Sequence, residues 1–420
     1  MGDKKNWLLT LALVFTGCLM IVGINPEAVG AADNFSPQVV ETVPAETQLG
    51  VDDFKKTHES FEELLSAAEE KIQIGVFYMI DAESSRLSEI LDTIEEKTEE
   101  GVRLEVVSDT VFYRNYPDVL DRLDELENSD VRIIDLDART GGVMHAKYFM
   151  VDDRHFYIGS ANFDWRSLEH IREVGIAGSS PEIVSRLQMI FAVDFELASR
   201  SDTAQWEEWQ SLQPPPDYRH LENETISMAD KSDTLMITAT PPELTPTEIM
   251  TSEEAIIRMI NSAQNEIFAD IFQYGLESPY SPDYYDEIDR ALRRAAARDV
   301  EVRLQVSSWS LTDYQQEYLK SLQQLSGIEV RYLDIPIASG GYTPYSRTSH
   351  PKLLVVDRDA AWLGSANWQP GYFDQSRNVG IITGDSQLVG DLRRFFLTAW
   401  TGPYARFIYP DKEYAPPYRE

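Results

Sequence analysis

The sequence predicts an α/β protein made of two copies of one unit, with two mixed sheets packed pseudo-symmetrically around a single active site. Three observations predict this class: helix-like and strand-like segments alternate, one histidine-lysine motif occurs twice at matched spacing, and a proline-rich stretch separates the copies. Alternating helices and strands are typical of sheets that helices cover on both faces. Because sites often form at domain interfaces, we expect both copies to contribute to one site.

Each copy is predicted to run helix, strand, long helix, strand, helix, strand and then a hairpin. Amphipathic spacing predicts the helices of the first copy at residues 58–70, 85–100 and 117–128. The matching helices of the second copy are predicted at residues 252–263, 281–298 and 311–325. Runs of alternating aliphatic residues predict equivalent strands at 102–107 and 300–306.

The chain of 420 residues is long enough for two domains of ordinary size. Proline, polar and charged residues predict a linker between them. The expected parts are a signal peptide or membrane anchor at 1–32, a first unit at 46–213, a linker at 214–248, a second unit at 249–405 and a C-terminal tail at 406–420.

Composition excludes some classes of partner and site. The formal net charge is −34, and acidic residues are spread through both copies. This balance argues against broad electrostatic binding of nucleic acid or anionic membrane, which needs a basic surface, although a small basic cleft is compatible with it. Cys18 is the only cysteine, so neither unit is expected to hold a disulfide or a thiolate metal site.

The N-terminal residues are typical of an export signal. Lys4 and Lys5 precede an apolar run at residues 7–22, and small residues follow at 28–32, as signal peptidase prefers. The run is almost long enough to span a bilayer, so an uncleaved anchor that makes membrane contact is an alternative. Lipidation of Cys18 is a third interpretation. In each case we expect the body of the protein outside the cytoplasmic membrane.

A His-x-Lys motif stands in each copy, followed by an aspartate and then by Gly-Ser-Ala-Asn. The lysine comes two residues after the histidine, the aspartate seven and the asparagine seventeen, in both copies. The paired positions are His145 and His350, Lys147 and Lys352, Asp152 and Asp357, Ser160 and Ser365, and Asn162 and Asn367. One His-x-Lys is weak evidence, but two copies with matched intervals are a strong signal.

These residue types suit phosphodiester cleavage. The reaction needs a nucleophile for phosphorus, an acid for the leaving oxygen and positive groups for the charged oxygens. Two histidines supply the first two, because an unperturbed pKa near 6.5 makes both protonation states accessible. The lysines, the asparagine amides and the serines are expected to bind the phosphate. No cluster of metal ligands is evident, so we expect neither a metal nor another cofactor.

Strand geometry separates the remaining motif residues. Side chains alternate along a strand, so each histidine faces the same side as its lysine. Asp152 and Asp357 have the other parity and begin turns, which predicts a structural role in the hairpins. Glu173 and Asn378 stand 28 residues after the two histidines and are well spaced to fix the imidazole tautomers.

The paired motifs resemble those of the phospholipase D superfamily across about residues 50–405. The stretch 155–168 resembles the animal membrane-anchored members that act as 5′-exonucleases on single-stranded nucleic acid, and their poxvirus envelope relatives; bacterial cardiolipin synthases are less similar. The resemblance implies a phosphohistidine intermediate, with His145 as nucleophile and His350 as acid. It also implies that Glu173 is the carboxylate that orients its histidine; Asn378 departs from that pattern.

Three functions are therefore considered. The first is hydrolysis or transfer of phosphatidyl groups of phospholipids outside the cytoplasm. The second is an exported 5′-exonuclease on single-stranded nucleic acid, and the third is a non-catalytic envelope or binding protein on the same fold. Aromatic residues near the second motif are predicted either to stack a base, to line a lipid cleft or to pack internally: Tyr342, Tyr345, Trp368 and Tyr372. We expect the active unit to be a monomer.

Overall fold

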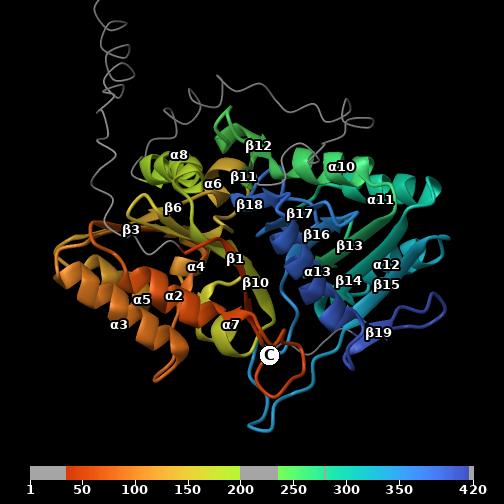
Figure 1. Ribbon diagram of the computed structural model, residues 1–420, viewed down its shortest axis with the longest axis horizontal. Coiled ribbons are helices and arrows are strands. Elements are labelled where there is room, and N and C mark those ends of the chain that lie inside the picture. The colour runs from red at the N-terminus through yellow and green to blue at the C-terminus, as the bar shows by residue number, and fades with distance from the viewer. Residues whose placement is uncertain (1–34, 199–234, 279–280, 416–420) are drawn as a thin grey trace, which may run out of the picture. The chain divides into compact units, whose positions relative to one another are not determined.

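Two mixed sheets organise the chain, and each contains one His-x-Lys motif. The computed structural model describes residues 35–198, 235–278 and 281–415. The described residues from Ser36 onward belong to one compact unit (Figure 1). The predicted signal peptide or anchor lies outside the described residues. Among the residues that are described, no helix is long and apolar enough to cross a membrane.

The first sheet has eight strands. In spatial order they are β2 (Lys55–Lys56), β1 (Gln38–Thr42), β10 (Glu173–Ser179), β8 (His155–Gly159), β7 (Lys147–Val151), β3 (Lys71–Val76), β5 (Arg103–Asp109) and β6 (Ser129–Ile134). Strands β3, β5 and β6 are parallel, whereas β7, β8 and β10 form an antiparallel run beside β3. The hairpin of β7 and β8 therefore sits in the middle of the sheet.

The second sheet repeats this order and adds one strand. Its strands are β12 (Met250–Thr251), β11 (Leu235–Thr240), β18 (Asn378–Thr383), β17 (Ala360–Gly364), β16 (Lys352–Val356), β13 (Glu266–Ile271), β14 (Glu301–Ser307), β15 (Ile328–Leu333) and β19 (Ala405–Phe407). Each of the first eight has a counterpart at the same place in the first sheet. The predicted α/β class with a duplicated unit is therefore confirmed.

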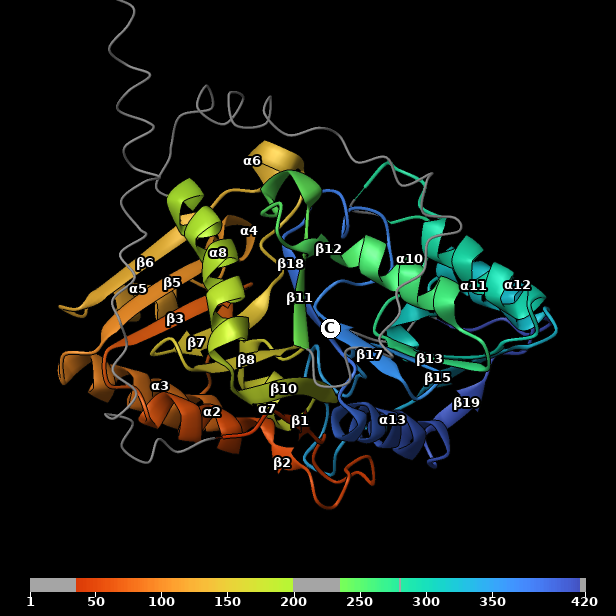
Figure 2. The same cartoon turned by 45° about the horizontal axis from the view of Figure 1, so that its top comes forward.

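Helices cover the sheets, and a shared apolar core lies between them (Figure 2). The first copy carries α2 (Thr57–Ser66), α3 (Arg86–Glu99), α5 (Asp118–Asp124) and α8 (Pro181–Ala198), and the second carries α10 (Ser252–Ser262), α11 (Glu287–Ala297), α12 (Gln315–Gln323) and α13 (Ser386–Trp400). Shorter helices are α4 (Thr110–Tyr113), α6 (Asp137–Thr140), α7 (Trp165–Glu169), η2 (Pro242–Leu244) and η3 (Ser308–Ser310). The two remaining strands, β4 (Met79–Ile80) and β9 (Phe163–Asp164), pair with each other.

The shared core explains why the two copies pack together. Tyr148 and Met150 of β7 are buried with Leu353 and Val355 of β16, and residues of α8 and α13 complete the cluster. Burial of apolar surface is the dominant favourable term in such packing. Because strand side chains alternate, Phe149 lies on the other face of β7, where its ring contacts Phe61 of α2 at 5.0 Å.

Local signals set the helix ends. The Ser85 hydroxyl accepts hydrogen bonds from the N–H groups of Leu87 and Ser88 at the start of α3, and the Asp385 carboxylate caps α13 in the same way. The predicted helix at 281–298 begins later, at Glu287. The reason is a loop in which the Tyr285 N–H donates to the carbonyl of Leu276 at 2.9 Å.

Three expected boundaries differ from the structure. The predicted linker 214–248 includes β11, which pairs with β18 from Leu235 to Thr240; its residues 214–234 lie outside the described part. Strand β1 precedes the expected start of the first unit at 46, because it pairs antiparallel with β10. The expected tail 406–420 contains Tyr414, which is buried in the core of the second copy.

Candidate active site

The two His-x-Lys segments each enter a central strand of their sheet. His145 precedes β7, and His350 precedes β16. All four histidine and lysine side chains are buried. The structure brings the predicted half-sites together, because the charges of Lys352 and His350 act on His145 and the charge of Lys147 acts on His350.

Backbone hydrogen bonds join each histidine to the other copy. The His145 N–H donates to the carbonyl of Arg377 at 2.8 Å, and the Arg377 N–H donates to the carbonyl of Val143 at 2.9 Å. The equivalent contacts join His350 to Arg172, and Arg172 to Thr348, each at 2.9 Å. The ends of β18 and β10 therefore reach across to the motif of the opposite copy.

This crossing decides which residue contacts each imidazole. Nδ1 of His145 lies 3.0 Å from Oδ1 of Asn378, and Nδ1 of His350 lies 2.9 Å from Oε2 of Glu173. Glu173 and Asn378 therefore contact the imidazoles, as their spacing predicts, and each contacts the histidine of the opposite copy. Glu173 begins β10 directly after the crossing residue Arg172, so its carboxylate faces the histidine of the second copy.

The amide orientation of Asn378 fixes the tautomer of His145. The Asn378 Nδ2 group donates to the carbonyls of Tyr372 and Ser376 at 2.7 and 3.3 Å. Carbonyls only accept, so Oδ1 must face His145, and Nδ1 of His145 must carry the proton. The lone pair of neutral His145 then lies on Nε2. His350 has the same tautomer, because the Ser160 carbonyl beside its Nδ1 can only accept.

The two motif serines support the imidazole partners and do not face a phosphate, which corrects the prediction. The Ser160 hydroxyl donates to Oε2 of Glu173 at 2.5 Å, and that of Ser365 donates to Oδ1 of Asn378 at 3.1 Å. Both hydroxyl oxygens also accept from the next strand, from the N–H groups of Val174 and Val379. Both side chains are fully buried, so their hydrogen-bonding capacity is used within the protein.

The motif glycines also serve packing. A Cβ atom on Gly159 would lie 2.4 Å from the Tyr157 hydroxyl, and one on Gly364 would lie 2.6 Å from the Trp362 ring. Such distances are far inside van der Waals contact. The glycines therefore make room for two large aromatic side chains of the sheets.

The two lysines place buried ammonium groups beside the histidines. Each Nζ donates to the carbonyl of the histidine in its own motif at 2.6 Å. Within the described part of the chain, neither lysine takes part in a salt bridge. Phe77 lies 5.1 Å from Nζ of Lys147, and Phe272 lies 4.9 Å from Nζ of Lys352. A bound anion would therefore meet two positive charges that no carboxylate neutralises directly.

The motif asparagines are buried close to the same site. Nδ2 of Asn162 donates to the Tyr78 hydroxyl at 3.2 Å. Oδ1 of Asn162 and Oδ1 of Asn367 are buried without a hydrogen-bond partner among the described residues. A buried unpaired polar atom is costly unless a ligand satisfies it. Rotation of either amide exchanges its donor and acceptor, which suits both residues to a polar substrate.

Burial and positive charge set the protonation states. Burial lowers the pKa of His145 well below its ordinary value, and the charges of Lys147 and Lys352 lower it further. Burial likewise lowers the pKa of His350, and it lowers the pKa of Lys352 to about 7. Burial raises the pKa of Glu173 to about 8, against the effect of Lys352. A bound anion favours the cationic forms of the two histidines and the two lysines.

Asp152 and Asp357 lie away from this site and hold loops. The Asp152 carboxylate accepts from the N–H groups of Glu69, Glu70 and Lys71 at 2.6 to 2.8 Å. Asp357 accepts from the corresponding loop of the second copy, at Gln264, Asn265 and Glu266. Both residues also begin hairpin turns with a positive φ of 51°. Each carboxylate thus fixes the helix-to-strand connection beside its own hairpin.

Aromatic rings extend from each imidazole toward the surface. On the first side, His145 contacts Phe77, whose ring lies 4.3 Å from Phe112, and Phe112 stacks on Tyr116 at 6.3 Å. Tyr116 is 43% exposed. We call the residues Phe77, Phe112 and Tyr116 the first aromatic row.

A second aromatic row leaves His350 and consists of Phe272, Trp309 and Tyr345. The ring centroids lie 4.5 Å apart for His350 and Phe272, 5.5 Å for Phe272 and Trp309, and 6.2 Å for Trp309 and Tyr345. Tyr345 is 48% exposed. Among the other aromatic residues considered, Trp368 is buried in a core, and Tyr372 contacts His145 edge-on at 5.1 Å.

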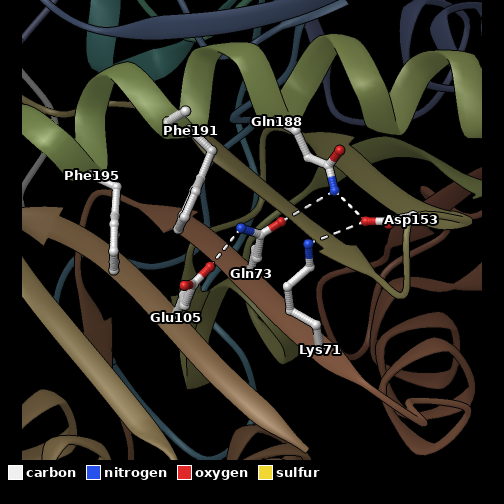
Figure 3. A pocket seen from close by; sticks show the side chains of 8 residues that line it. Lys71, Gln73, Glu105, Asp153, Gln188, Phe191 and Phe195 are labelled. Carbon is white, nitrogen blue, oxygen red and sulfur yellow. Dashed lines mark hydrogen bonds and ion pairs between the residues drawn. The ribbon is translucent and has the colours of Figure 1, made fainter. Parts of the chain in front are cut away.

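A cavity of about 320 Å³ lies elsewhere, between α8 and the first sheet (Figure 3). Its polar side chains bind one another: Nε2 of Gln73 donates to Glu105 at 2.6 Å, and Lys71 pairs with Asp153 at 3.2 Å. None of its lining residues belongs to the site described above. Among the described residues, no group of three or more histidine, cysteine, aspartate or glutamate side chains is placed to hold a metal ion.

Arg172 and Arg377 were not identified from the sequence, although they carry the crossing contacts. Each arginine directly precedes an imidazole partner, Glu173 or Asn378, and stands 27 residues after the histidine of its own copy. This matched interval was a usable signal. An arginine that acts through its backbone carbonyl gives no chemical signal of its own in the sequence, because every residue has such a carbonyl.

Comparison with known proteins agrees with the duplicated architecture. The family model described as "Cardiolipin synthase, PLD-like domain" matches residues 61–195 and 256–400. The solved phosphatidylserine synthase of Haemophilus influenzae superposes with a TM-score of 0.59 at 14% identity and covers 83% of this chain and 85% of its own. At this identity the likeness concerns the fold alone.

Curated relatives are similar over most of their length. Phospholipase D Z of Dictyostelium discoideum is 26% identical, covering 88% of this chain and 90% of its own. The 5'-3' exonuclease PLD4 of Homo sapiens is 28% identical, covering 91% and 81%. The virion nicking-joining enzyme of vaccinia virus (strain Western Reserve) is 29% identical, covering 90% of both chains.

Proposed function

Because this chain belongs to the phospholipase D superfamily, with the PLD-like domain matched in both copies, we propose that it cleaves phosphodiesters through a phosphohistidine formed on His145. The observation that carries the proposal is the unequal pair of imidazole contacts. A neutral amide faces His145 and a carboxylate faces His350. The first favours a neutral nucleophile, and the second favours a protonated acid.

The first step joins phosphorus to His145. The lone pair on Nε2 of His145 attacks phosphorus, and the bond from phosphorus to the leaving oxygen breaks. His350 begins this step protonated, and Glu173 stabilises its positive charge. His350 then gives the proton on Nε2 to the leaving oxygen. Lys147 and Lys352 hold the charged phosphate oxygens, where a buried ammonium is worth more than in water.

The second step releases the phosphoryl group. Nε2 of His350, now neutral, takes a proton from water, and the water oxygen attacks phosphorus. The bond between phosphorus and Nε2 of His145 breaks, and the lone pair returns to His145. If an alcohol takes the place of water, the same site transfers the group.

Single-stranded nucleic acid is the substrate that the surroundings of the site favour. A phosphodiester carries a substituent on each side of phosphorus, and the two aromatic rows leave the site from the two imidazoles. Aromatic rings stack nucleobases irrespective of sequence. Relatives with the printed name 5'-3' exonuclease support this choice. The net charge of −34 makes stacking, together with the two buried lysines, the main source of affinity.

A phosphatidyl substrate is the second candidate. The loop between β15 and His350 exposes Ile337, Tyr342 and Tyr345, and residues 335–346 contain no charged side chain. Exposed apolar side chains of this kind suit contact with lipid. The relative named Phospholipase D Z is in line with this alternative. We place the protein outside the cytoplasmic membrane on the basis of its N-terminal residues, with a monomer as the active unit.

The decisive experiment compares the two substrates directly. Purified protein is incubated with a 5′-hydroxyl oligonucleotide and, separately, with labelled phosphatidylcholine and phosphatidylglycerol vesicles in EDTA. His145→Ala and His350→Ala are expected to abolish cleavage, and His58→Ala, outside the site, is expected to retain it. Quenching in alkaline detergent, in which the bond between phosphorus and the imidazole nitrogen persists, should trap a phosphorylated protein in the wild type and none in His145→Ala. Full activity of either site variant would exclude the two-histidine reaction, and consumption of lipid alone would reverse the ranking of substrates.

A further inference from the structure

Two fully buried arginines cross between the copies, and each finds its carboxylate on the opposite side. Arg172 of the first copy donates from Nη1 to Asp270 of β13 at 2.6 Å and to Ser349 at 3.0 Å. Its Nη2 donates to the carbonyl of Phe395 in α13 at 2.9 Å. The Arg172 and Asp270 side chains are both inaccessible to solvent.

Arg377 of the second copy makes the reciprocal connection. Its Nε and Nη2 atoms donate to the Asp194 carboxylate of α8 at 2.7 to 2.9 Å. Its Nη atoms also donate to the carbonyls of Thr240 and Leu244 at 2.7 and 2.8 Å. Arg377 and Asp194 are likewise inaccessible to solvent. The guanidinium is thus held on several sides by groups from both copies.

A buried ion pair is weak evidence for stability, because removing two charges from water offsets much of their attraction. The main chain shows what these pairs provide. The carbonyl of each arginine accepts the N–H of one histidine, and the next residue presents its side chain to the ring of that same histidine. Fixing the guanidinium therefore fixes both contacts of the imidazole.

We propose that Arg377 and Arg172 are positioning residues with separate duties, Arg377 for phosphorus attack by His145 and Arg172 for proton transfer by His350. The proposal rests on the proposed function and assigns new residues to it. Small displacements of reacting groups are enough to slow a reaction by large factors. Loss of either arginine should therefore affect one chemical step more than the other.

The leaving group separates the two duties. Cleavage of a thymidine dinucleotide expels an alkoxide, which needs a proton from His350. Cleavage of thymidine 3′-(p-nitrophenyl phosphate) expels a phenoxide that leaves without one, while attack by His145 is required for both. The comparison uses single-turnover rates of the full-length protein, so that release of the phosphoryl group does not limit the measurement.

Paired substitutions avoid leaving a buried charge without a partner. Arg377→Met is combined with Asp194→Leu, and Arg172→Met with Asp270→Asn, because Asp270 must still accept from Gln305. We expect the rate of the Arg172 pair to fall about tenfold more on the dinucleotide than on the aryl ester. This factor is smaller than the usual contribution of general acid catalysis, because His350 is displaced and not removed. The Arg377 pair should lose the same factor, at least about tenfold, in the single-turnover rate on both substrates.

The proposal would be overturned if both paired variants, with a normal melting transition, cleaved at the wild-type rate. It would also be overturned if the Arg172 pair lost the same factor on both substrates, or if the loss of the Arg377 pair depended on the leaving group. If a paired variant does not fold, Arg377→Lys and Arg172→Lys test the same difference, because lysine keeps the charge and cannot reach all acceptors of the guanidinium. A wild type that cleaves neither substrate and traps no phosphohistidine would remove the proposed function and this inference together. An active wild type with unselective arginine variants would remove the inference alone.

Discussion

Nδ1 of His350 lies 2.9 Å from the carboxylate of Glu173, a residue of the other copy that stands 177 positions earlier in the chain. His145, at the matched position, faces the uncharged amide of Asn378. One substitution in a duplicated sequence therefore makes the two imidazoles chemically different. This difference is the basis for our proposal that His350 is the acid and His145 the nucleophile.

Replacing the carboxylate by an amide should weaken the acid. Glu173→Gln keeps an acceptor for Nδ1 of His350 and removes the negative charge that favours the imidazolium. The pKa of His350 in the substrate complex then falls, and the alkaline limb of kcat moves to lower pH. We expect a loss of roughly 100-fold at neutral pH, measured as a pH–rate profile on the dinucleotide. Glu105→Gln is the matched control, since Glu105 is also buried and bonds to Gln73.

The same variant changes how stability depends on pH. The pKa of Glu173 rises from its ordinary value of 4.5 to about 8 on burial. A raised folded-state pKa means that the folded protein holds the proton more tightly, so this contribution is fully present below pH 4.5 and is lost as the pH rises through about 8. The stability of the wild type relative to Glu173→Gln should fall over that window in urea unfolding. A pH-independent difference would contradict the assignment.

The buried lysines should cost stability while the site is empty. Burial and the charge of Lys352 lower the pKa of Lys147 well below its ordinary value. We expect Lys147→Met to be more stable than the wild type by about 1–2 kcal/mol and inactive, as often occurs when a strained functional group is removed. Tungstate or phosphate should raise the melting temperature of the wild type and not that of the variant. Lys97→Met, at a half-buried position of α3, serves as the control. A destabilised Lys147→Met would refute this expectation.

The repeat made most of the site predictable from the sequence. Spacing placed His145, Lys147 and Asn162 in one half and their counterparts in the other, and strand parity separated Asp152 from the histidine. What spacing lacks is the partner across the interface. Nothing in the intervals around Glu173 indicates that Arg172, the residue before β10, pairs with Ser349, the residue before His350.

The sequence also left the short outer strands undetected. Leu235–Thr240 was assigned to a linker because its neighbours are polar and proline-rich, and a six-residue strand has no periodic signal beyond its own length. Its pairing with β18 is a long-range contact. The motif serines were misassigned for a related reason, since their hydroxyl groups are used by a neighbouring strand that follows later in the chain.

Removing the motif aspartates should affect folding and leave chemistry unchanged. Asp152→Ala frees three backbone N–H groups that the carboxylate now satisfies, and Asp357→Ala does the same in the second copy. We expect each to lower the free energy of unfolding by about 1–3 kcal/mol. At a temperature where the variants remain folded, kcat should be that of the wild type. Asp359→Ala, in the exposed hairpin turn, should change neither quantity, and a large loss of kcat in Asp152→Ala would place this carboxylate in the reaction.

The first aromatic row offers a test of substrate class that leaves the imidazoles untouched. Tyr116 is exposed and stacks on Phe112, whose ring contacts Phe77 beside His145. If a nucleobase stacks on this tyrosine, Tyr116→Ala removes an interaction of about 1–3 kcal/mol per base and raises KM for an oligonucleotide by about tenfold, with kcat nearly unchanged.

Tyr409→Ala removes a tyrosine of similar exposure, 53% against 43%, from the C-terminal segment and should leave KM unaltered. Tyr116→Phe should restore the wild-type KM, since stacking needs the ring and not the hydroxyl. An unchanged KM in Tyr116→Ala, together with weaker turnover of phospholipid vesicles, would show instead that the row binds lipid.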